Sequence, residues 1–450
     1  MQIFGPGQSV YCVWGSSATL GIDRLPNRHA IVTPSMTKRW YLWRNANGRR
    51  PVPKAGFWGL GSSTGTLCCL SPSEKETFVV FQLVTGALGL FVALHLWPLL
   101  PASLLVRILS CICIGVISQH HFLTKLAFGT MFSAEVPRFV VIGVNVLFAT
   151  LVFAAVLFLA LDLLRLIVAV VRRAWIPLPL VAGWGVLGVA LVLGVIGVVS
   201  AIAQPAVRRV DIPIANLAER FDGYRIVQLT DLHLSRLFQA PWATELVLRT
   251  NALAPDAILI TGDLIDGTLE ARARDVAPLA DLQAADGVFV VSGNHEYYFN
   301  HDRWMAHYAG LGMTVLHNEH VVLGGPAAGL VLAGVPDRSA HRFGLSGPDL
   351  GAALRGAPKG LPVILLNHQP ADAHLSAQAG VDLHLSGHTH GGMIRGLDAL
   401  IARFNDGFVS GLYRLGDTAL YVNNGTALWP GFSVRLGVPS ELTVFTLVRA

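Results

Sequence analysis

The sequence has few charged residues. Asp, Glu, Lys and Arg together make up 14% of the 450 residues, whereas hydrophobic residues make up 53%. Soluble globular domains carry roughly 25% charged residues, so this composition excludes an ordinary soluble protein and indicates membrane segments. The formal net charge is +5, but many of the basic residues flank apolar runs. Charge in that position is typical of membrane topology, and it disfavours a nucleic-acid partner.

Cysteine is also scarce. The five cysteines are Cys12, Cys68, Cys69, Cys111 and Cys113. Their number is odd, and none lies in the C-terminal half of the chain. The sequence therefore disfavours a disulfide framework, and any metal site in the C-terminal half must use oxygen and imidazole ligands in place of thiolates.

Long apolar runs, by contrast, are prominent. They span Phe78–Leu99, Ala102–Ser118, Phe139–Leu161 and Leu178–Ile202. Because a helix needs about 20 apolar residues to cross a bilayer, residues 76–203 are predicted to form four transmembrane helices of a multi-pass protein of the cell membrane. The lipid bilayer is then a partner of the chain. The distribution of Lys and Arg around the runs leans towards a cytoplasmic C-terminal domain.

The remaining sequence divides into three parts. Residues 1–75 are rich in Gly, Ser and Arg without periodicity, which predicts a disordered or loosely structured segment; Met36 is a second candidate start within it. Residues 204–220 contain Pro205 and Pro213 and are predicted to be a linker. Residues 221–450 alternate apolar β-type runs with helical patterns, which predicts an α/β domain.

Polar clusters follow five of the predicted strands. The strands are Tyr224–Leu229, Ala257–Thr261, Val288–Ser292, Leu361–Leu366 and Val381–Ser386. The clusters are Asp231-Leu-His233, Gly262-Asp263-Leu-Ile-Asp266, Gly293-Asn294-His295-Glu296, Asn367-His368 and Gly387-His388-Thr-His390. In an open α/β sheet, ligands bind outside the carboxyl ends of the strands. The clusters are therefore predicted to meet in one active site.

The donor atoms of these clusters suit divalent metal ions. Seven residues supply oxygen or imidazole donors: Asp231, His233, Asp263, Asn294, His368, His388 and His390. Such a mixture favours Mn²⁺, Fe²⁺ or Zn²⁺. Seven donors exceed what one ion with an open position needs, and they suffice for two ions if one carboxylate bridges. Asp266 fits either an outer carboxylate of the site or an ordinary turn residue, and buried packing is the simpler interpretation of His384.

The ordered set of clusters resembles the calcineurin-like metallophosphoesterase superfamily, whose pattern is D-x-H, G-D, G-N-H-[DE], H and G-H-x-H. The longer motif Gly-Asn-His-Glu-Tyr-Tyr resembles that of a membrane-linked branch of the superfamily. The resemblance implies two sheets packed face to face with helices outside. It implies that Asp231, His233, Asp263 and His390 hold one metal, and that Asp263, Asn294, His368 and His388 hold the other. It also implies that His295 protonates the leaving oxygen and that Glu296 orients His295.

These features together predict a membrane-anchored phosphoesterase with two metals. It would hydrolyse a phosphoester or pyrophosphate by attack of a metal-bound hydroxide. Membrane attachment favours a phosphorylated, lipid-linked substrate, and some relatives in the resembling branch act on UDP-2,3-diacylglucosamine in lipid A synthesis. Two alternatives stay open. The helices could form a transporter or receptor that the domain regulates. Alternatively, the domain could be a metal-dependent nuclease, which would need a basic groove to bind DNA.

Overall fold

The computed structural model of the chain describes residues 72–101, 103–175 and 177–450. The predicted loosely structured segment, the candidate start at Met36, and Cys12, Cys68 and Cys69 lie outside the described residues. The last residues of that predicted segment differ from the expectation, because a helix already begins at Pro72.

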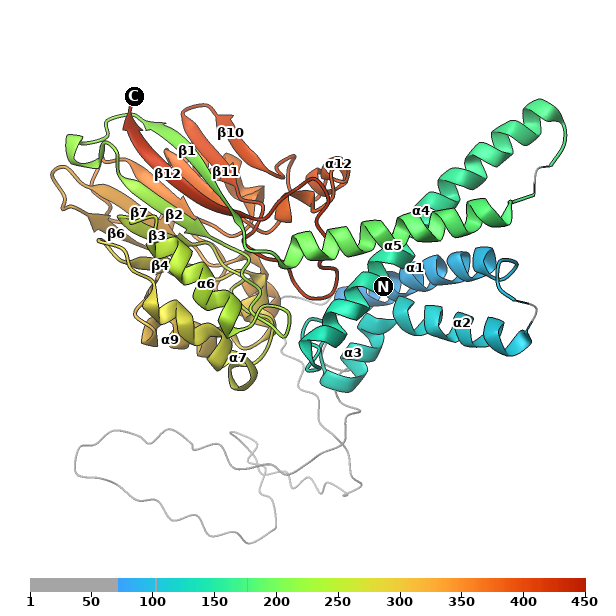
Figure 1. Cartoon of the computed structure of the whole chain (residues 1–450). Coiled ribbons are helices and arrows are strands. Elements are labelled where there is room, and N and C mark those ends of the chain that lie inside the picture. Colours follow the sequence, from blue (N-terminus) through green and yellow to red (C-terminus); the bar gives the residue numbers. More distant parts are fainter. Residues whose placement is uncertain (1–71, 102, 176) are drawn as a thin grey trace, which may run out of the picture. The chain divides into compact units, whose positions relative to one another are not determined.

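The apolar runs form helices, as predicted. They are α1 (Pro72–Leu96), α2 (Leu104–Ser118), α3 (His120–Phe128), α4 (Arg138–Arg172) and α5 (Leu180–Ile202) (Figure 1). Within the described residues, three helices are long and apolar enough to cross a membrane, namely α1 from Phe78, α4 and α5. The pair α2 and α3, bent by 64°, makes a fourth candidate if it is counted as one span.

Helix α4 is longer than its predicted run. It continues through Asp162, whose carboxylate lies 2.8 Å from His95 Nε2 of α1 and 2.7 Å from Arg165 Nη1. Asp162 thus has two partners for its carboxylate, so an apolar helix can accommodate this charge. The residues after Leu161, where the predicted run ends, thus belong to one continuous helix of 35 residues.

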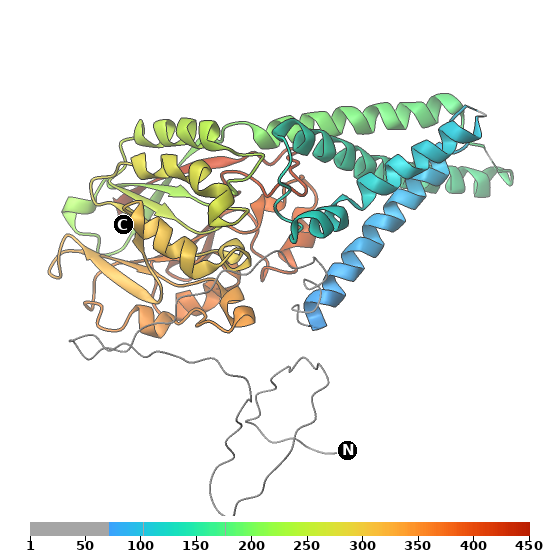
Figure 2. The ribbon, with the colours of Figure 1, turned by 90° about the horizontal axis from the view of Figure 1, so that it is seen from below.

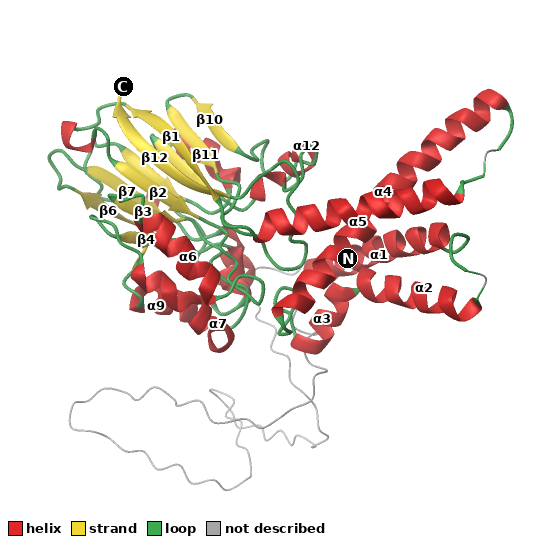
Figure 3. Cartoon of the chain, in the orientation of Figure 1, coloured by secondary structure: helices red, strands yellow, loops and turns green. Residues whose placement is uncertain are grey.

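The C-terminal part contains two six-stranded sheets (Figures 1 and 3). The first has the order β1-β12-β2-β3-β4-β5 and the second the order β10-β11-β9-β8-β7-β6. The strands are β1 (Ala206–Ile214), β2 (Arg225–Leu229), β3 (Ala257–Ile260), β4 (Val288–Val290), β5 (Thr314–Val315), β6 (Glu319–Leu323), β7 (Leu330–Gly334), β8 (Val363–Leu366), β9 (Leu383–Ser386), β10 (Gly411–Leu415), β11 (Thr418–Val422) and β12 (Glu441–Arg449). Neighbouring strands from β2 to β5 are parallel, as are β7, β8, β9 and β11.

Helices cover the outer faces of both sheets. The helices of this part are α6 (Ala240–Asn251), α7 (Leu269–Val276), α8 (Asn294–Tyr298), α9 (His301–Gly310), α10 (Leu350–Ala353), α11 (Ala373–Gln378) and α12 (Asp398–Ala402). Helices α10 and α11 pack on the second sheet. Helices α6, α7 and α9 lie on one side of the first sheet (Figures 1 and 2). The layers are therefore helix, sheet, sheet and helix, which confirms the predicted two-sheet sandwich.

Burial on both faces explains the continuous apolar runs of the strands. In β2, Val227 and Leu229 pack in the core beneath α6, whereas Ile226 packs in the core between the two sheets. Because alternate strand residues point to opposite faces, a strand with two covered faces has no polar positions to alternate. Most polar side chains therefore stand at the strand ends, although Gln228 is buried within β2.

The predicted linker 204–220 differs from the structure. Residues Ala206–Ile214 form β1, which pairs in parallel with β12 over nine residues. The two prolines of this stretch, Pro205 and Pro213, favoured a linker over a strand in the sequence. Pro213 is accommodated because β1 is an edge strand, where one row of backbone N–H groups needs no ladder partner.

Candidate metal centre

The five predicted polar clusters converge where β2, β3, β4, β8 and β9 end. Asp231 and His233 follow β2, Asp263 follows β3, Asn294 and His295 begin α8 after β4, and His368 follows β8. His388 and His390 follow β9. The two sheets meet at this edge, so residues up to 159 positions apart in the sequence share one buried site. Six of the seven predicted ligands are buried, and His388 is half-buried.

The first group of donors contains Asp231, His233 and His390. His233 Nε2 lies 3.3 Å from His390 Nε2, and His390 Nε2 lies 3.6 Å from Asp231 Oδ1. His233 Nε2 lies 3.9 Å from Asp231 Oδ1. Two ring nitrogens and a carboxylate oxygen thus face one point from three sides.

The second group contains Asp263, Asn294, His368 and His388. His368 Nε2 lies 3.2 Å from both Asp263 Oδ2 and Asn294 Oδ1. His388 Nδ1 lies 3.0 Å from Asn294 Oδ1 and 3.3 Å from His368 Nε2. The opposite ring nitrogen of His368, Nδ1, lies 2.7 Å from the carbonyl oxygen of Thr261. Donation of Nδ1–H to that carbonyl leaves the Nε2 lone pair facing the site.

Asp263 lies between the two groups. Its Oδ2 is 3.2 Å from His368 Nε2 in the second group and 3.9 Å from His233 Nε2 in the first. Its other oxygen, Oδ1, accepts a hydrogen bond of 2.8 Å from the backbone N–H of His295. The carboxylate is therefore fixed by one oxygen and directs the other to both groups, which is the position that a bridging ligand needs.

The electrostatics of the site fit divalent cations. Burial lowers the pKa of His388 to about 3 and that of His390 well below its ordinary value, so both rings are neutral and present lone pairs. Burial opposes charge on His368 too, yet Asp263 and Asp231 raise its pKa well above the ordinary value. The buried carboxylates thus create a negative potential that favours positive charge, and neutral imidazoles beside carboxylates are the form in which these residues bind metals.

Several of the candidate ligands have a strained backbone. Asp231, His233, Asp263, His388 and His390 all have positive φ, between 43° and 70°. A non-glycine residue in this region costs about 1 kcal/mol or more, and such residues collect at functional sites. Backbone hydrogen bonds hold two of them, because Asp231 N–H donates to Gly262 O at 3.0 Å and His233 N–H donates to Asp263 O at 3.1 Å.

Glu296 has a different position from the one predicted. Its carboxylate accepts hydrogen bonds from the backbone N–H groups of Asp263, Leu264 and Gly293, at 3.0, 2.7 and 2.7 Å. The carboxylate bound to the His295 ring is that of Asp266, at Nδ1. Glu296 is the third residue of α8, so its side chain folds back to the start of the helix. It therefore fixes the Asp263 and Gly293 loops, and the prediction that it orients His295 is wrong.

Asp266 contacts two of the site histidines. One oxygen bonds His295 Nδ1, and the other lies 3.1 Å from His233 Nδ1. Both Nε2 atoms are then directed towards Asp263 Oδ2, each 3.9 Å away. Burial lowers the pKa of His295, but Asp263 and Asp266 outweigh it and raise that pKa to about 9. His295 can therefore carry a proton at Nε2, and Asp266 is its positioning residue.

Sequence reasoning missed two further contributors. Arg435 is buried, and its guanidinium donates to the carbonyl oxygens of His390, Asn424 and Ala427 at 3.2, 2.6 and 3.0 Å. Phe132, from the connection between α3 and α4, has its ring 5.0 Å from the His295 ring. A lone Arg and a lone Phe far from the polar clusters carry no signal of their own. His384, by contrast, is buried beside Ser386 as expected.

Gly293 leaves room for the Asp263 carboxylate. A Cβ at this position would overlap Asp263 Oδ1 and lie 2.6 Å from its backbone N. We therefore expect Gly293→Ala to displace Asp263 and to weaken metal binding by about tenfold or more, measured by calorimetric titration of Mn²⁺. Gly310→Ala is the matched control, because a Cβ there meets open space; equal metal affinity in both variants would contradict this packing.

Comparison with known proteins identifies the family. The family model for calcineurin-like phosphoesterases matches residues 224–392. The bovine transmembrane protein with metallophosphoesterase domain is 37% identical over 274 residues, which are 58% of this chain and 61% of that protein. The uncharacterised metallophosphoesterase YkuE of Bacillus subtilis is 32% identical over 235 residues, which are 50% of this chain and 80% of that protein. The chain spans about three fifths of the length of the bovine relative. Its C-terminal domain makes it a member of the calcineurin-like metallophosphoesterase family.

Proposed function

We propose that the chain is a membrane-anchored hydrolase of phosphoesters or pyrophosphates that uses two divalent ions. The observation that carries this proposal is the place of Asp263 Oδ2 between the two donor groups. Asp231, His233, Asp263 and His390 would hold one ion, and Asp263, Asn294, His368 and His388 the other. When bound, two such ions polarise phosphoryl oxygens and lower the pKa of a water molecule. Mn²⁺, Fe²⁺ and Zn²⁺ all suit the donor set.

The protein's own residues would then direct the proton of the reaction. A water molecule would give up one proton, which passes through solvent and later restores the proton on His295. Its oxygen would form a bond to phosphorus as the bond from phosphorus to the ester oxygen breaks. The leaving oxygen takes the proton from His295 Nε2, while the Asp266 carboxylate keeps the ring turned towards the site. The raised pKa of His295 supports this role, because the ring must hold a proton until the leaving oxygen needs it.

The membrane helices support a substrate linked to lipid. A multi-pass anchor in the cell membrane would make the bilayer a permanent partner and confine the site to its surface. The side that the site faces is proposed to be the cytoplasm, from the distribution of basic residues alone. UDP-2,3-diacylglucosamine is one compound of the proposed class, with a pyrophosphate between a nucleoside and an acylated sugar.

The transporter or receptor alternative is less well supported. An intramembrane charge often marks a transport path, and Asp162 is such a charge. Its carboxylate, however, is shared by His95 and Arg165 of the same chain. That arrangement favours a structural role for Asp162, which links α4 to α1 through His95. The nuclease alternative predicts cleavage of DNA that weakens steeply with salt, which a nuclease assay over a salt series would detect.

The leaving group gives a direct test of the proposed chemistry. The full chain in detergent with Mn²⁺ should hydrolyse bis(p-nitrophenyl) phosphate, and a chelator should stop it. His295→Gln should slow the hydrolysis of a phenyl methyl phosphate about 100-fold more than that of p-nitrophenyl methyl phosphate, because p-nitrophenolate leaves without an acid. Equal slowing of both substrates would remove His295 from the acid role. Activity that survives the chelator and His388→Ala would overturn the proposed function.

A further inference from the structure

The connection between α3 and α4, residues 129–137, is fastened to the catalytic domain beside the metal centre. The Glu135 carboxylate pairs with the buried guanidinium of Arg272 and lies 2.8 Å from Arg236 Nε. Ser133 Oγ donates to the backbone carbonyl oxygen of Asp266 at 3.1 Å. These contacts join a segment from the apolar helices to the residue that positions His295.

Phe132 of this connection forms a wall of the site. Its ring stacks on Tyr298 with a centroid distance of 5.0 Å and an interplanar angle of 5°. The edge-on contact with the His295 ring has the same centroid distance, and Trp429 lies 5.8 Å away. The proposed acid is therefore covered on one side by an aromatic ring that the membrane part of the chain supplies.

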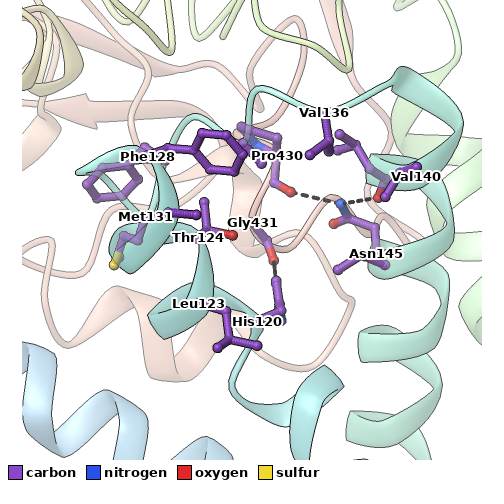
Figure 4. A pocket seen from close by; sticks show the side chains of 15 residues that line it. His120, Leu123, Thr124, Phe128, Met131, Val136, Val140, Asn145, Pro430 and Gly431 are labelled. Atoms are coloured by element: carbon purple, nitrogen blue, oxygen red, sulfur yellow. Dashed lines mark hydrogen bonds between the residues drawn. The ribbon is translucent and has the colours of Figure 1, made fainter. Parts of the chain in front are cut away.

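Phe132 also lines an apolar cavity of about 240 Å³. Figure 4 shows the side chains around this cavity. It is lined by residues of α3, the connection and α4, together with Pro430 and Gly431. The apolar side chains that decide its character are Leu123, Ala127, Phe128, Met131, Val140 and Val144. Three polar side chains line it, and two of them already have partners: His120 Nε2 lies 3.3 Å from Gly431 O, and Asn145 Nδ2 donates to Pro430 O at 2.8 Å. The third is the hydroxyl of Thr124.

The size and lining of the cavity favour an alkyl occupant. One water molecule needs only about 10–15 Å³ of such volume, but it also needs two to four polar partners. This cavity is many times larger and offers few such partners. Burial of each methylene group there would strengthen the binding of the occupant.

The rim of the cavity faces the surroundings of the apolar helices. Leu123 and Phe128 line the cavity and are each 40% exposed. They belong to α3, which together with α2 is apolar enough to cross a membrane. Exposed apolar side chains on such a helix suit contact with lipid, whereas in water they would be a liability. A lipid chain could therefore enter the cavity from the side without crossing water.

We propose that this cavity binds one alkyl or acyl chain of the substrate, while the phosphorus of the same molecule reaches the metal centre across Phe132. The inference rests on the proposed function and deepens it, because it selects lipid phosphoesters as the substrate class. Phe132 then has two contacts to make, one with the first methylene groups and one with the proposed acid.

Phosphodiesters that differ only in chain length test this inference. The substrates are p-nitrophenyl methyl phosphate and p-nitrophenyl dodecyl phosphate, assayed with the full chain in detergent and Mn²⁺. We expect kcat/KM to be at least about tenfold higher for the dodecyl ester. Ala127→Trp, which fills the cavity, should remove that advantage and leave the methyl ester unaffected. Leu126→Trp should keep the advantage, because Leu126 is on the same helix, 65% exposed, and does not line the cavity.

A binding measurement without metal separates this inference from the proposed function. A dodecyl phosphate with a terminal diazirine should label peptides of residues 120–145 in metal-free protein, and unlabelled dodecyl phosphate but not methyl phosphate should compete. Ala127→Trp should lower this labelling several-fold relative to Leu126→Trp. Equal labelling of the two variants, or a dodecyl advantage that survives Ala127→Trp, would overturn the inference. Failure to hydrolyse either ester, with labelling intact, would instead overturn the proposed function.

Discussion

Asp263→Asn should lower kcat for phosphodiester hydrolysis by about a thousandfold. The substitution keeps an acceptor for the His295 N–H, which Asp263 Oδ1 binds at 2.8 Å, but it removes the charge that lies between the two donor groups. Metal ions contribute several kcal/mol to the transition state, and each 1.36 kcal/mol is a factor of ten in rate. A steady-state assay at saturating Mn²⁺ would measure the loss.

The control for this variant lies at the opposite end of the same strand, β3. Asp256 precedes β3 at its other end and accepts a hydrogen bond of 2.7 Å from the backbone N–H of Arg225. Asp256→Asn should therefore change kcat less than about twofold while it alters the charge of the domain by the same amount. A similar loss in both variants would mean that charge or stability, and not a bridging position, explains the effect of Asp263.

Glu296→Ala should destabilise the catalytic domain strongly. The substitution removes the acceptor of three buried backbone N–H groups, on Asp263, Leu264 and Gly293. Each buried donor left without a partner costs about 1–3 kcal/mol, so a loss of at least about 3 kcal/mol is expected. For a domain of this size that corresponds to a fall in the thermal midpoint of roughly 6–12 °C, which differential scanning fluorimetry of the full chain would detect.

Glu270→Ala provides the matched comparison. Glu270 is also a glutamate near the start of a helix, but it is exposed and pairs with Arg303 at 2.6 Å. Exposed pairs of this kind contribute little to stability, so its thermal midpoint should stay within about 2 °C of the wild type. Equal midpoints for Glu296→Ala and the wild type would show that the Asp263 and Gly293 loops hold their shape without the carboxylate.

The convergence of the candidate ligands was predictable from the sequence because they follow strands. The runs of β2, β3 and β4 are largely apolar, so Asp231, Asp263 and Asn294 stand out as the first carboxylate or amide side chains after each strand. Parallel strands bring their carboxyl ends to one edge, which makes their convergence predictable. The separate roles of Glu296 and Asp266 were not predictable, because both carboxylates lie within a few residues of the ligands and only side-chain direction distinguishes them.

Local sequence patterns could not predict the contacts between segments that are distant in the chain. Pro205 and Pro213 disfavoured the prediction of a strand at β1. The partner of this strand, β12, lies more than 230 residues away in the chain. Phe132 and Glu135 lie in the short connection between two apolar helices, where polar and aromatic residues are ordinary. Their partners Tyr298 and Arg272 are in another domain, and no local pattern couples them. The sequence therefore predicted only an anchoring role for the apolar helices. In the structure, the connection between two of them places Phe132 against His295.

The metal content of the purified protein tests the central claim most directly. The full chain would be loaded with Mn²⁺, desalted and measured by plasma mass spectrometry together with Asp263→Asn. The account predicts about two ions per wild-type chain and fewer than one in the variant, since the shared carboxylate serves both positions. Wild-type protein that retains no ion, or a variant that retains as many ions as the wild type, would contradict it.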